Sequence, residues 1–237
     1  MKPSSSRTLC LLGILLFAFH PMKAQEHAFA AGDVLDILTV EAFGDSTFFT
    51  SQPISDAVFT RMKGHSYPES CPIALSNLRY LHVLHCDIDG HTHVGELVVN
   101  KAIAGDVLEI LLALYRAHYP IERMQLIDDF DADDERSMSA NNSSAFCCRT
   151  VSGSSRLSKH ALGMAIDINP LYNPYYRVRR DGSALIQPAT GAPYVNRALE
   201  FPYKITRNDL CHRLFLAHGF RWGGAWSSIK DYQHFEK

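Results

Sequence analysis

The sequence has little net charge and few long apolar runs. Its 23 basic and 25 acidic side chains among 237 residues give a formal net charge of −2. A nucleic-acid-binding protein would normally show a basic excess, so we expect no nucleic-acid partner. With 46% hydrophobic residues, 14 Gly and 11 Pro, and no internal repeat, the sequence is not that of a disordered or collagen-like chain. It predicts a globular protein of one large domain or two small ones.

Several sequence motifs are also absent, and each absence excludes a class of site. No C-x-x-C pair exists, so neither a zinc ribbon nor a thioredoxin motif is supported. There is no G-x-S-x-G elbow for serine hydrolysis. The acidic run from Asp128 to Asp134 lacks the spacing of a calcium-binding EF-hand loop.

The first residues have the pattern of a secretory signal peptide. Lys2 and Arg7 precede the apolar run LCLLGILLFAF, which is followed by HPMKAQ and a preferred cleavage site after Ala24. The run is shorter than the roughly 20 residues that a membrane-spanning helix needs. We therefore expect residues 1–24 to be removed and the protein to be exported, periplasmic or extracellular, with no stable membrane insertion. Losing three basic residues and no acid would change the net charge from −2 to −5.

The cysteines of the mature chain would be odd in number. They are Cys71, Cys86, Cys147, Cys148 and Cys211. An exported compartment permits disulfides, but at least one thiol must stay unpaired. The sequence does not decide which cysteines pair.

The middle of the chain predicts a hairpin followed by a helix. Residues 78–84 and 94–99 have strand patterns around the turn-forming sequence DIDG, which favours a β-hairpin. The apolar residues of 107–114 recur at i, i+3, i+4 and i+7, as on one face of a helix. Residues 124–127 could form a following strand, and the polar segment 128–144 is predicted to be a surface loop.

A second helix is expected around residues 210–215, ending near Gly219. Helix and strand patterns alternate without a strict βαβ rhythm, which favours an α+β fold. After the signal peptide we expect one domain, 76–237, with residues 25–75 as an N-terminal extension packed on it. Residues 26–60 mix short apolar groups with Ser, Thr and Gly and predict no particular element.

The segment SKHALGMAIDINP, residues 158–170, carries the first candidate chemistry. Read as a strand from Met164, it places Asp167 opposite the apolar Ile166 and Ile168. His160 lies before it, across Gly163, where the chain can bend. A His and an Asp held in this way can supply nitrogen and oxygen ligands to zinc, although such a pair is more often structural.

The second candidate segment is the C-terminal WGGAWSSIKDYQHFE. His234 could be a third ligand, and Asp231 precedes it by three residues. Catalytic zinc sites use three protein ligands and leave a fourth position to water, whose proton a nearby carboxylate can accept. Alone, a D-x-x-H at a chain end would be an exposed tail.

Together the two segments resemble the zinc D-alanyl-D-alanine carboxypeptidase and L-alanyl-D-glutamate endopeptidase family, the VanY-like metallopeptidases. SKHALGMAIDINP is similar to the S-x-H-x-x-G-x-A-x-D signature, and DYQHFE to the acid-x-x-His element. The resemblance extends from about Gly95 to Lys237. It implies a single α+β domain with a largely antiparallel central sheet flanked by helices, as in zinc DD-peptidases and Hedgehog-type domains.

The resemblance also implies roles for individual residues and a function. One zinc ion would be held by His160, Asp167 and His234. Asp231 would be the general base, and Arg149 in FCCRTVSG would bind the scissile carbonyl oxygen.

Ser158 would either bind substrate or shape its turn. The implied function is a secreted zinc peptidase that cleaves amide bonds in peptidoglycan peptides, as a carboxypeptidase or an endopeptidase, with a monomer expected. The alternative is a non-catalytic, zinc-stabilised binding or signalling module of the same fold.

One further histidine pair attracts attention. His91 and His93 alternate as same-face strand ligands would, but they lie beside the predicted turn and no third partner is evident. We therefore predict a solvent-exposed hairpin there.

Overall fold

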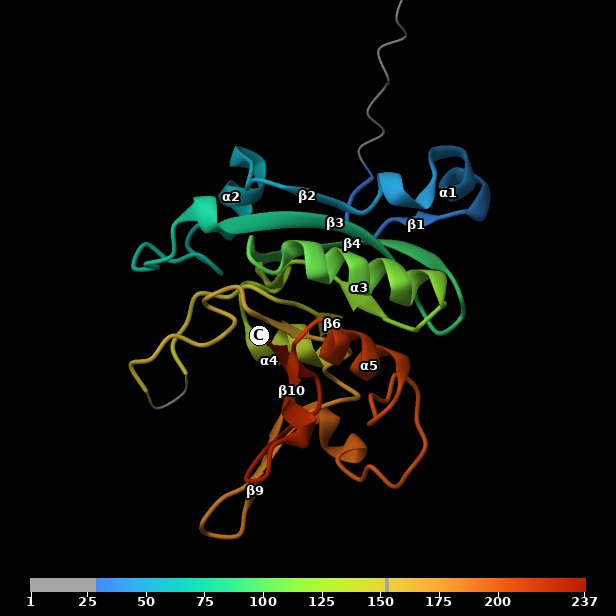
Figure 1. Cartoon of the computed structure of the whole chain (residues 1–237). Coiled ribbons are helices and arrows are strands. Elements are labelled where there is room, and N and C mark those ends of the chain that lie inside the picture. Colours follow the sequence, from blue (N-terminus) through green and yellow to red (C-terminus); the bar gives the residue numbers. More distant parts are fainter. Residues whose placement is uncertain (1–28, 152–153) are drawn as a thin grey trace, which may run out of the picture.

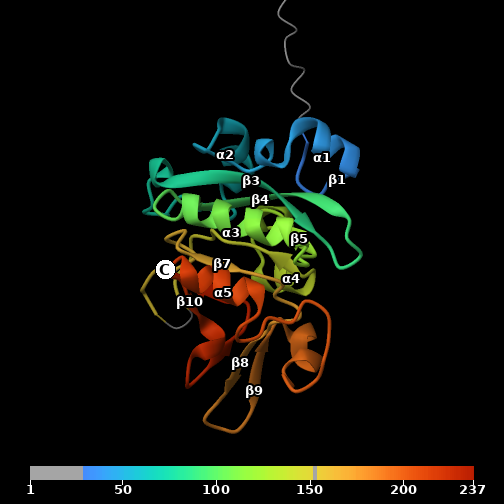
Figure 2. The ribbon, with the colours of Figure 1, turned by 45° about the vertical axis from the view of Figure 1, so that its right-hand side comes forward.

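A four-stranded antiparallel sheet, with strand order β1-β4-β3-β2, forms one end of the molecule (Figure 1). The computed structural model describes residues 29–151 and 154–237, so the predicted signal peptide lies outside the described residues. The strands are β1 Val34–Leu35, β2 Thr50–Gln52, β3 Leu78–Cys86 and β4 Thr92–Asn100. Helices α1 (Ile37–Phe43) and α2 (Asp56–Met62) lie on one side of this sheet, and α3 (Ala104–Arg116) lies on the other (Figures 1 and 2).

The predicted hairpin and helix are both present. β3 pairs with β4 from Leu78 opposite Asn100 to Cys86 opposite Thr92, and the chain reverses through a turn in which Gly90 donates to the Asp87 carbonyl. The apolar face of α3 is buried against this pair of strands. Its buried residues include Val107, Ile110, Leu111 and Leu114. Burying four such side chains contributes roughly 6–12 kcal/mol and fixes α3 on the sheet.

A second group of short strands lies beyond α3. A three-stranded antiparallel sheet has the order β10-β12-β7, and a second has the order β11-β8-β9. These strands are β7 Ala165–Asp167, β8 Tyr175–Val178, β9 Ala184–Gln187, β10 Arg221–Trp222, β11 Lys230–Asp231 and β12 His234–Glu236. Helix α5 (Leu210–Ala217) covers the first of them, and the β8–β9 hairpin projects at the far end of the molecule (Figure 2). Phe235 and Ile166 join the core that α3 also borders.

The predicted second helix is α5, which ends before Gly219 as expected. The predicted strand at 124–127 is shorter than expected. β5 (Arg123–Met124) pairs in parallel with β6 (Asn142–Ser143), and Ile127 already begins a 3₁₀ helix. The 3₁₀ helices are Asp45–Thr47, Leu75–Asn77, Ile127–Phe130, Ala189–Tyr194 and Gly223–Ala225.

The prediction of a surface loop at residues 128–144 was wrong. The segment contains α4 (Asp134–Ser139) and strand β6, and Ser137, Asn142 and Ser143 are buried. The side chain of Asn142 donates to the Gln125 carbonyl and to the Ser137 hydroxyl. Polar residues are therefore buried here because each finds a hydrogen-bonding partner, and hydrophobic periodicity does not reveal that.

The described part of the N-terminal region contacts the rest of the chain through strands, an ion pair and a disulfide. β1 pairs with β4 and β2 pairs with β3. Arg61 forms an ion pair with the buried Glu96 of β4, and Cys71 is bonded to Cys148. Cys86, Cys147 and Cys211 are free thiols.

Helices and mostly antiparallel sheets are thus combined as the predicted α+β class requires. Among the described residues, no helix combines the length and apolar character needed to cross a membrane.

Candidate functional site

Two antiparallel strands bring the two motifs of the sequence together. β12 pairs with β7 so that His234 lies directly opposite Asp167. The side chains of β7 and of the residue after it alternate between two faces, as predicted. Ile166 and Ile168 are buried in the core, and Asp167 lies on the other face. Residues that are 67 positions apart in the sequence therefore present their side chains side by side.

Three side-chain donor atoms converge at this point. The Asp167 carboxylate lies 3.0 Å from His234 Nδ1 and 3.2 Å from His160 Nε2. The two imidazole nitrogens are 3.1 Å apart. The three predicted ligands are therefore brought together, with one potential ligand atom of each lying within 4.8 Å of the others.

A tight turn positions His160. The Ser158 hydroxyl accepts a hydrogen bond from the Ala161 amide at 3.0 Å, so the structure places Ser158 in the turn itself. Gly163 ends this turn with a φ of 66°, and a Cβ there would lie 2.6 Å from the Asn100 amide nitrogen. Only glycine fits such a conformation and approach. His160 Nδ1 donates to the Ala145 carbonyl at 2.6 Å, which leaves Nε2 free to bind a metal.

Glu236 is a supporting residue that the sequence analysis missed. It follows His234 by two positions on β12, on the same face, and its carboxylate lies 3.5 Å from His234 Nε2. Arg221 of β10 holds the other side of this carboxylate at 2.7 Å. A carboxylate behind a ligating imidazole fixes the ring and raises its basicity. The i, i+2 spacing on a strand could have revealed Glu236.

The electrostatics of the three-residue cluster favour a cation. Burial would raise the pKa of Asp167, but His160 and His234 beside it hold that pKa well below its usual range. Burial would likewise lower the pKa of His234, yet hydrogen bonds with Asp167 and Glu236 raise it to about 10. The carboxylates thus stabilise positive charge at this point, and a bound dication would supply that charge while the imidazoles are neutral.

Asp231 precedes His234 by three residues, but it lies on β11, in a different sheet from β7 and β12. Its Oδ1 is buried without a hydrogen-bonding partner, and burial raises the pKa of its carboxyl group to about 6. Gly223 lies so close to Asp231 that a Cβ at position 223 would be only 2.8 Å from the Asp231 Cβ. An unpartnered buried carboxylate oxygen with a raised pKa is the arrangement expected of a proton acceptor.

Arg149 contacts both α4 and the turn that carries His160. Its guanidinium forms an ion pair with Asp134 at 2.8 Å, and its backbone carbonyl accepts from the Ser158 amide. Burial would lower the pKa of Arg149, but negative groups led by Asp134 raise it. The loop carrying Arg149 is therefore fastened to the turn that carries His160, while its guanidinium is engaged by α4.

The tryptophans of the C-terminal segment differ in their surroundings. Trp222 is buried in the core and donates to the Tyr232 carbonyl. Trp226 is only partly buried, and its ring centroid lies 5.5 Å from that of His234. Trp226 therefore forms a wall beside the three-residue cluster.

Comparison with known proteins supports the family prediction. Residues 152–237 match the family model described as D-alanyl-D-alanine carboxypeptidase, which confirms the predicted resemblance for this part of the chain. The matched part includes the three candidate ligands and Asp231, and Arg149 precedes it. A search of curated proteins and a search of solved structures each gave no match. Similarity to the DD-peptidase and Hedgehog-type folds therefore stays a prediction.

Proposed function

We propose that this protein is an exported zinc metallopeptidase that hydrolyses amide bonds in peptidoglycan peptides, as a D-alanyl-D-alanine carboxypeptidase or an L-alanyl-D-glutamate endopeptidase. The observation that carries the proposal is the convergence of His160 Nε2, Asp167 and His234 Nδ1 within hydrogen-bonding distance of one another. The family match to residues 152–237 supports a peptidase independently of that geometry.

The donor set fits zinc. Two neutral imidazoles and one carboxylate are a common protein ligand set for this ion, with a further position left for water or substrate. Asp167 and Glu236 supply the negative charge that a dication requires. When bound, zinc would polarise the substrate carbonyl and lower the pKa of a water molecule to about 7.

The remaining chemistry falls to residues of the chain. Asp231, with its unpartnered Oδ1, accepts the proton of the attacking water and returns it to the leaving amine. Its carboxylate is available above the raised pKa of about 6, which suits a base acting near neutral pH. Arg149 stabilises the developing oxyanion once its guanidinium exchanges Asp134 for substrate.

Digestion of purified muropeptides, followed by mass spectrometry of the products, tests the proposal and identifies the bond. The mature protein should release new termini, and a chelator should stop it. Release of free D-alanine indicates a carboxypeptidase, and cleavage next to D-glutamate indicates an endopeptidase. Binding to peptidoglycan without any hydrolysis would refute the proposal and favour the non-catalytic binding module.

Two variants separate metal binding from proton transfer. His160→Ala should lose both zinc and activity. Asp231→Asn should keep zinc but lose about 10²–10⁴-fold in kcat, the usual contribution of a general base. Asp181→Asn, at the exposed tip of the β8–β9 hairpin, is the matched control and should keep both. Unchanged kcat in Asp231→Asn would remove Asp231 from the role of base.

A further inference from the structure

A second group of potential metal ligands lies at the turn between β3 and β4. The prediction that His91 and His93 have no third partner was wrong, because the structure places Asp87 between them. Asp87 Oδ2 lies 3.0 Å from His91 Nδ1 and 2.9 Å from His93 Nε2. One carboxylate oxygen therefore faces two imidazole nitrogens, whereas Asp167 in the candidate zinc site faces its two histidines with different oxygens.

The turn itself orients the Asp87 carboxylate. Its Oδ1 accepts hydrogen bonds from the backbone amides of Asp89 at 3.0 Å and His91 at 2.9 Å. These bonds occupy one oxygen and direct the other towards the two rings. Hydrogen bonds that hold a ligating group in place strengthen a metal site, because less order has to be imposed on binding.

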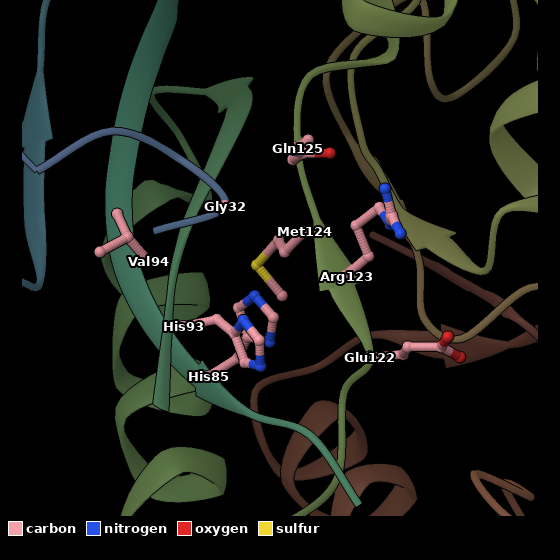
Figure 3. Close-up of a pocket in the computed structure, with 8 residues that line it drawn as sticks. All are labelled: Gly32, His85, His93, Val94, Glu122, Arg123, Met124 and Gln125. Carbon is pink, nitrogen blue, oxygen red and sulfur yellow. The ribbon is translucent and has the colours of Figure 1, made fainter. Parts of the chain in front are cut away.

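The ring of His93 is held from behind. His93 pairs with His85 across the β3–β4 ladder, and the two rings stack with centroids 5.3 Å apart and an angle of 14° between planes. Figure 3 shows the two rings side by side next to Met124. His85 is itself fixed, since its Nδ1 donates to the Ile121 carbonyl at 2.7 Å. Both rings line a cavity of about 220 Å³.

We propose that Asp87, His91 and His93 form a second metal site, which takes a first-row transition-metal dication such as zinc. Two of the three donors are nitrogen, and calcium and magnesium prefer all-oxygen sets. The side chain of Asp87 is 17% exposed and that of His93 is 19% exposed, whereas His91 is 62% exposed. The open side at His91 leaves room for water ligands.

This second site is independent of the proposed peptidase function. Its donors come from the β3–β4 hairpin, whereas the candidate zinc ligands come from β7, β12 and the turn before β7. A metal here would clamp the turn, which also contacts the second half of the chain where the Ile88 amide donates to the Tyr203 hydroxyl.

Zinc stoichiometry tests the proposal in the full mature chain. After dialysis against zinc, metal analysis should give two ions per wild-type chain and one in the His160→Ala/His234→Ala variant. Adding Asp87→Asn to that variant should remove the remaining ion. Asn at position 87 can still accept the turn hydrogen bonds through its side-chain oxygen, so the hairpin is expected to fold.

A matched control and a second measurement keep the test decisive. His65→Ala removes an exposed histidine outside both clusters and should leave two ions bound. Asp87→Asn alone should lower the count from two to one, weaken zinc binding at the hairpin at least tenfold, and leave muropeptide hydrolysis unchanged. A wild-type chain that binds only one zinc, or an Asp87→Asn chain that still binds two, would overturn the second site without bearing on the peptidase.

Discussion

Removing the Cys71–Cys148 disulfide should destabilise the protein by several kcal/mol. The bond closes a loop between residues 77 positions apart. If its main effect is on the entropy of the unfolded chain, a loop of this length corresponds to about 4.5 kcal/mol at 25 °C. For a domain of this size, that loss lowers Tm by roughly 9–18 °C.

The structure adds a local consequence. Cys148 immediately precedes Arg149, and its amide also donates to the Ser66 carbonyl. The disulfide therefore fastens the loop carrying Arg149 to the N-terminal region. Without it we expect kcat/KM for muropeptides to fall while zinc content is preserved, because the ligands lie on other segments.

The assay is urea unfolding at pH 7 of Cys71→Ser/Cys148→Ser in a Cys147→Ser background. That background prevents the neighbouring free thiol of Cys147 from exchanging with the disulfide. Cys147→Ser alone is the control, so the difference between the two proteins isolates the bond. A difference below about 1 kcal/mol would refute the entropic reasoning, since loop closure by itself predicts several times more.

Three further predictions concern the surroundings of the two histidine clusters. Glu236→Gln should weaken zinc binding about 10–100-fold in chelator competition, because it removes the carboxylate behind His234. Gly223→Ala should reduce kcat more than zinc content in muropeptide and metal assays, since its Cβ would collide with Asp231. Burial lowers the pKa of His85 to about 4 from an unfolded value of 6.5, so the folded state resists its protonation. That contribution, about 3 kcal/mol, is complete above pH 6.5 and is lost as the pH falls towards 4, and His85→Gln should flatten this part of the urea-unfolding profile.

Each of these predictions has a control or a contrary outcome. Glu200→Gln changes an exposed glutamate and should leave zinc binding unaltered. Gly105→Ala, in α3, adds a Cβ with no atom within 4 Å and should be neutral or slightly stabilising. If His85→Gln kept the wild-type slope between pH 4 and 6.5, other groups would account for the acid sensitivity.

The parts of the fold that could be predicted from sequence are those with strong periodic patterns. The β3–β4 hairpin has long apolar strands around DIDG, and α3 has a complete i, i+3, i+4, i+7 stripe. Helices α1 and α2 were missed although each has a capping residue. Asp36 and Ser55 accept from the amides three positions later. With only seven residues each, these helices have too few turns for an apolar stripe to be recognised.

The candidate zinc site could likewise be predicted from the sequence only in part. Two motifs predicted which residues would meet, and the structure brings His160, Asp167 and His234 together. The supporting contacts escaped prediction because they depend on long-range placement. The Ala145 carbonyl behind His160 comes after β6, a strand made of polar residues in a segment expected to be a loop. The sequence identifies Asp87 as a turn residue, but the direction of its second carboxylate oxygen depends on the folded turn.

The two clusters share a donor set, and their burial predicts the order in which they fill with zinc. In the candidate zinc site the side chains of His160, Asp167 and His234 are 8–14% exposed. At the hairpin the side chain of His91 is 62% exposed, so a bound ion competes with solvent and restricts the rotamers of an exposed side chain. The first equivalents of zinc should therefore fill the buried cluster and restore peptidase activity to metal-free protein. The hairpin should fill afterwards, without further gain in activity. Activity that rises only with the second equivalent would contradict this order.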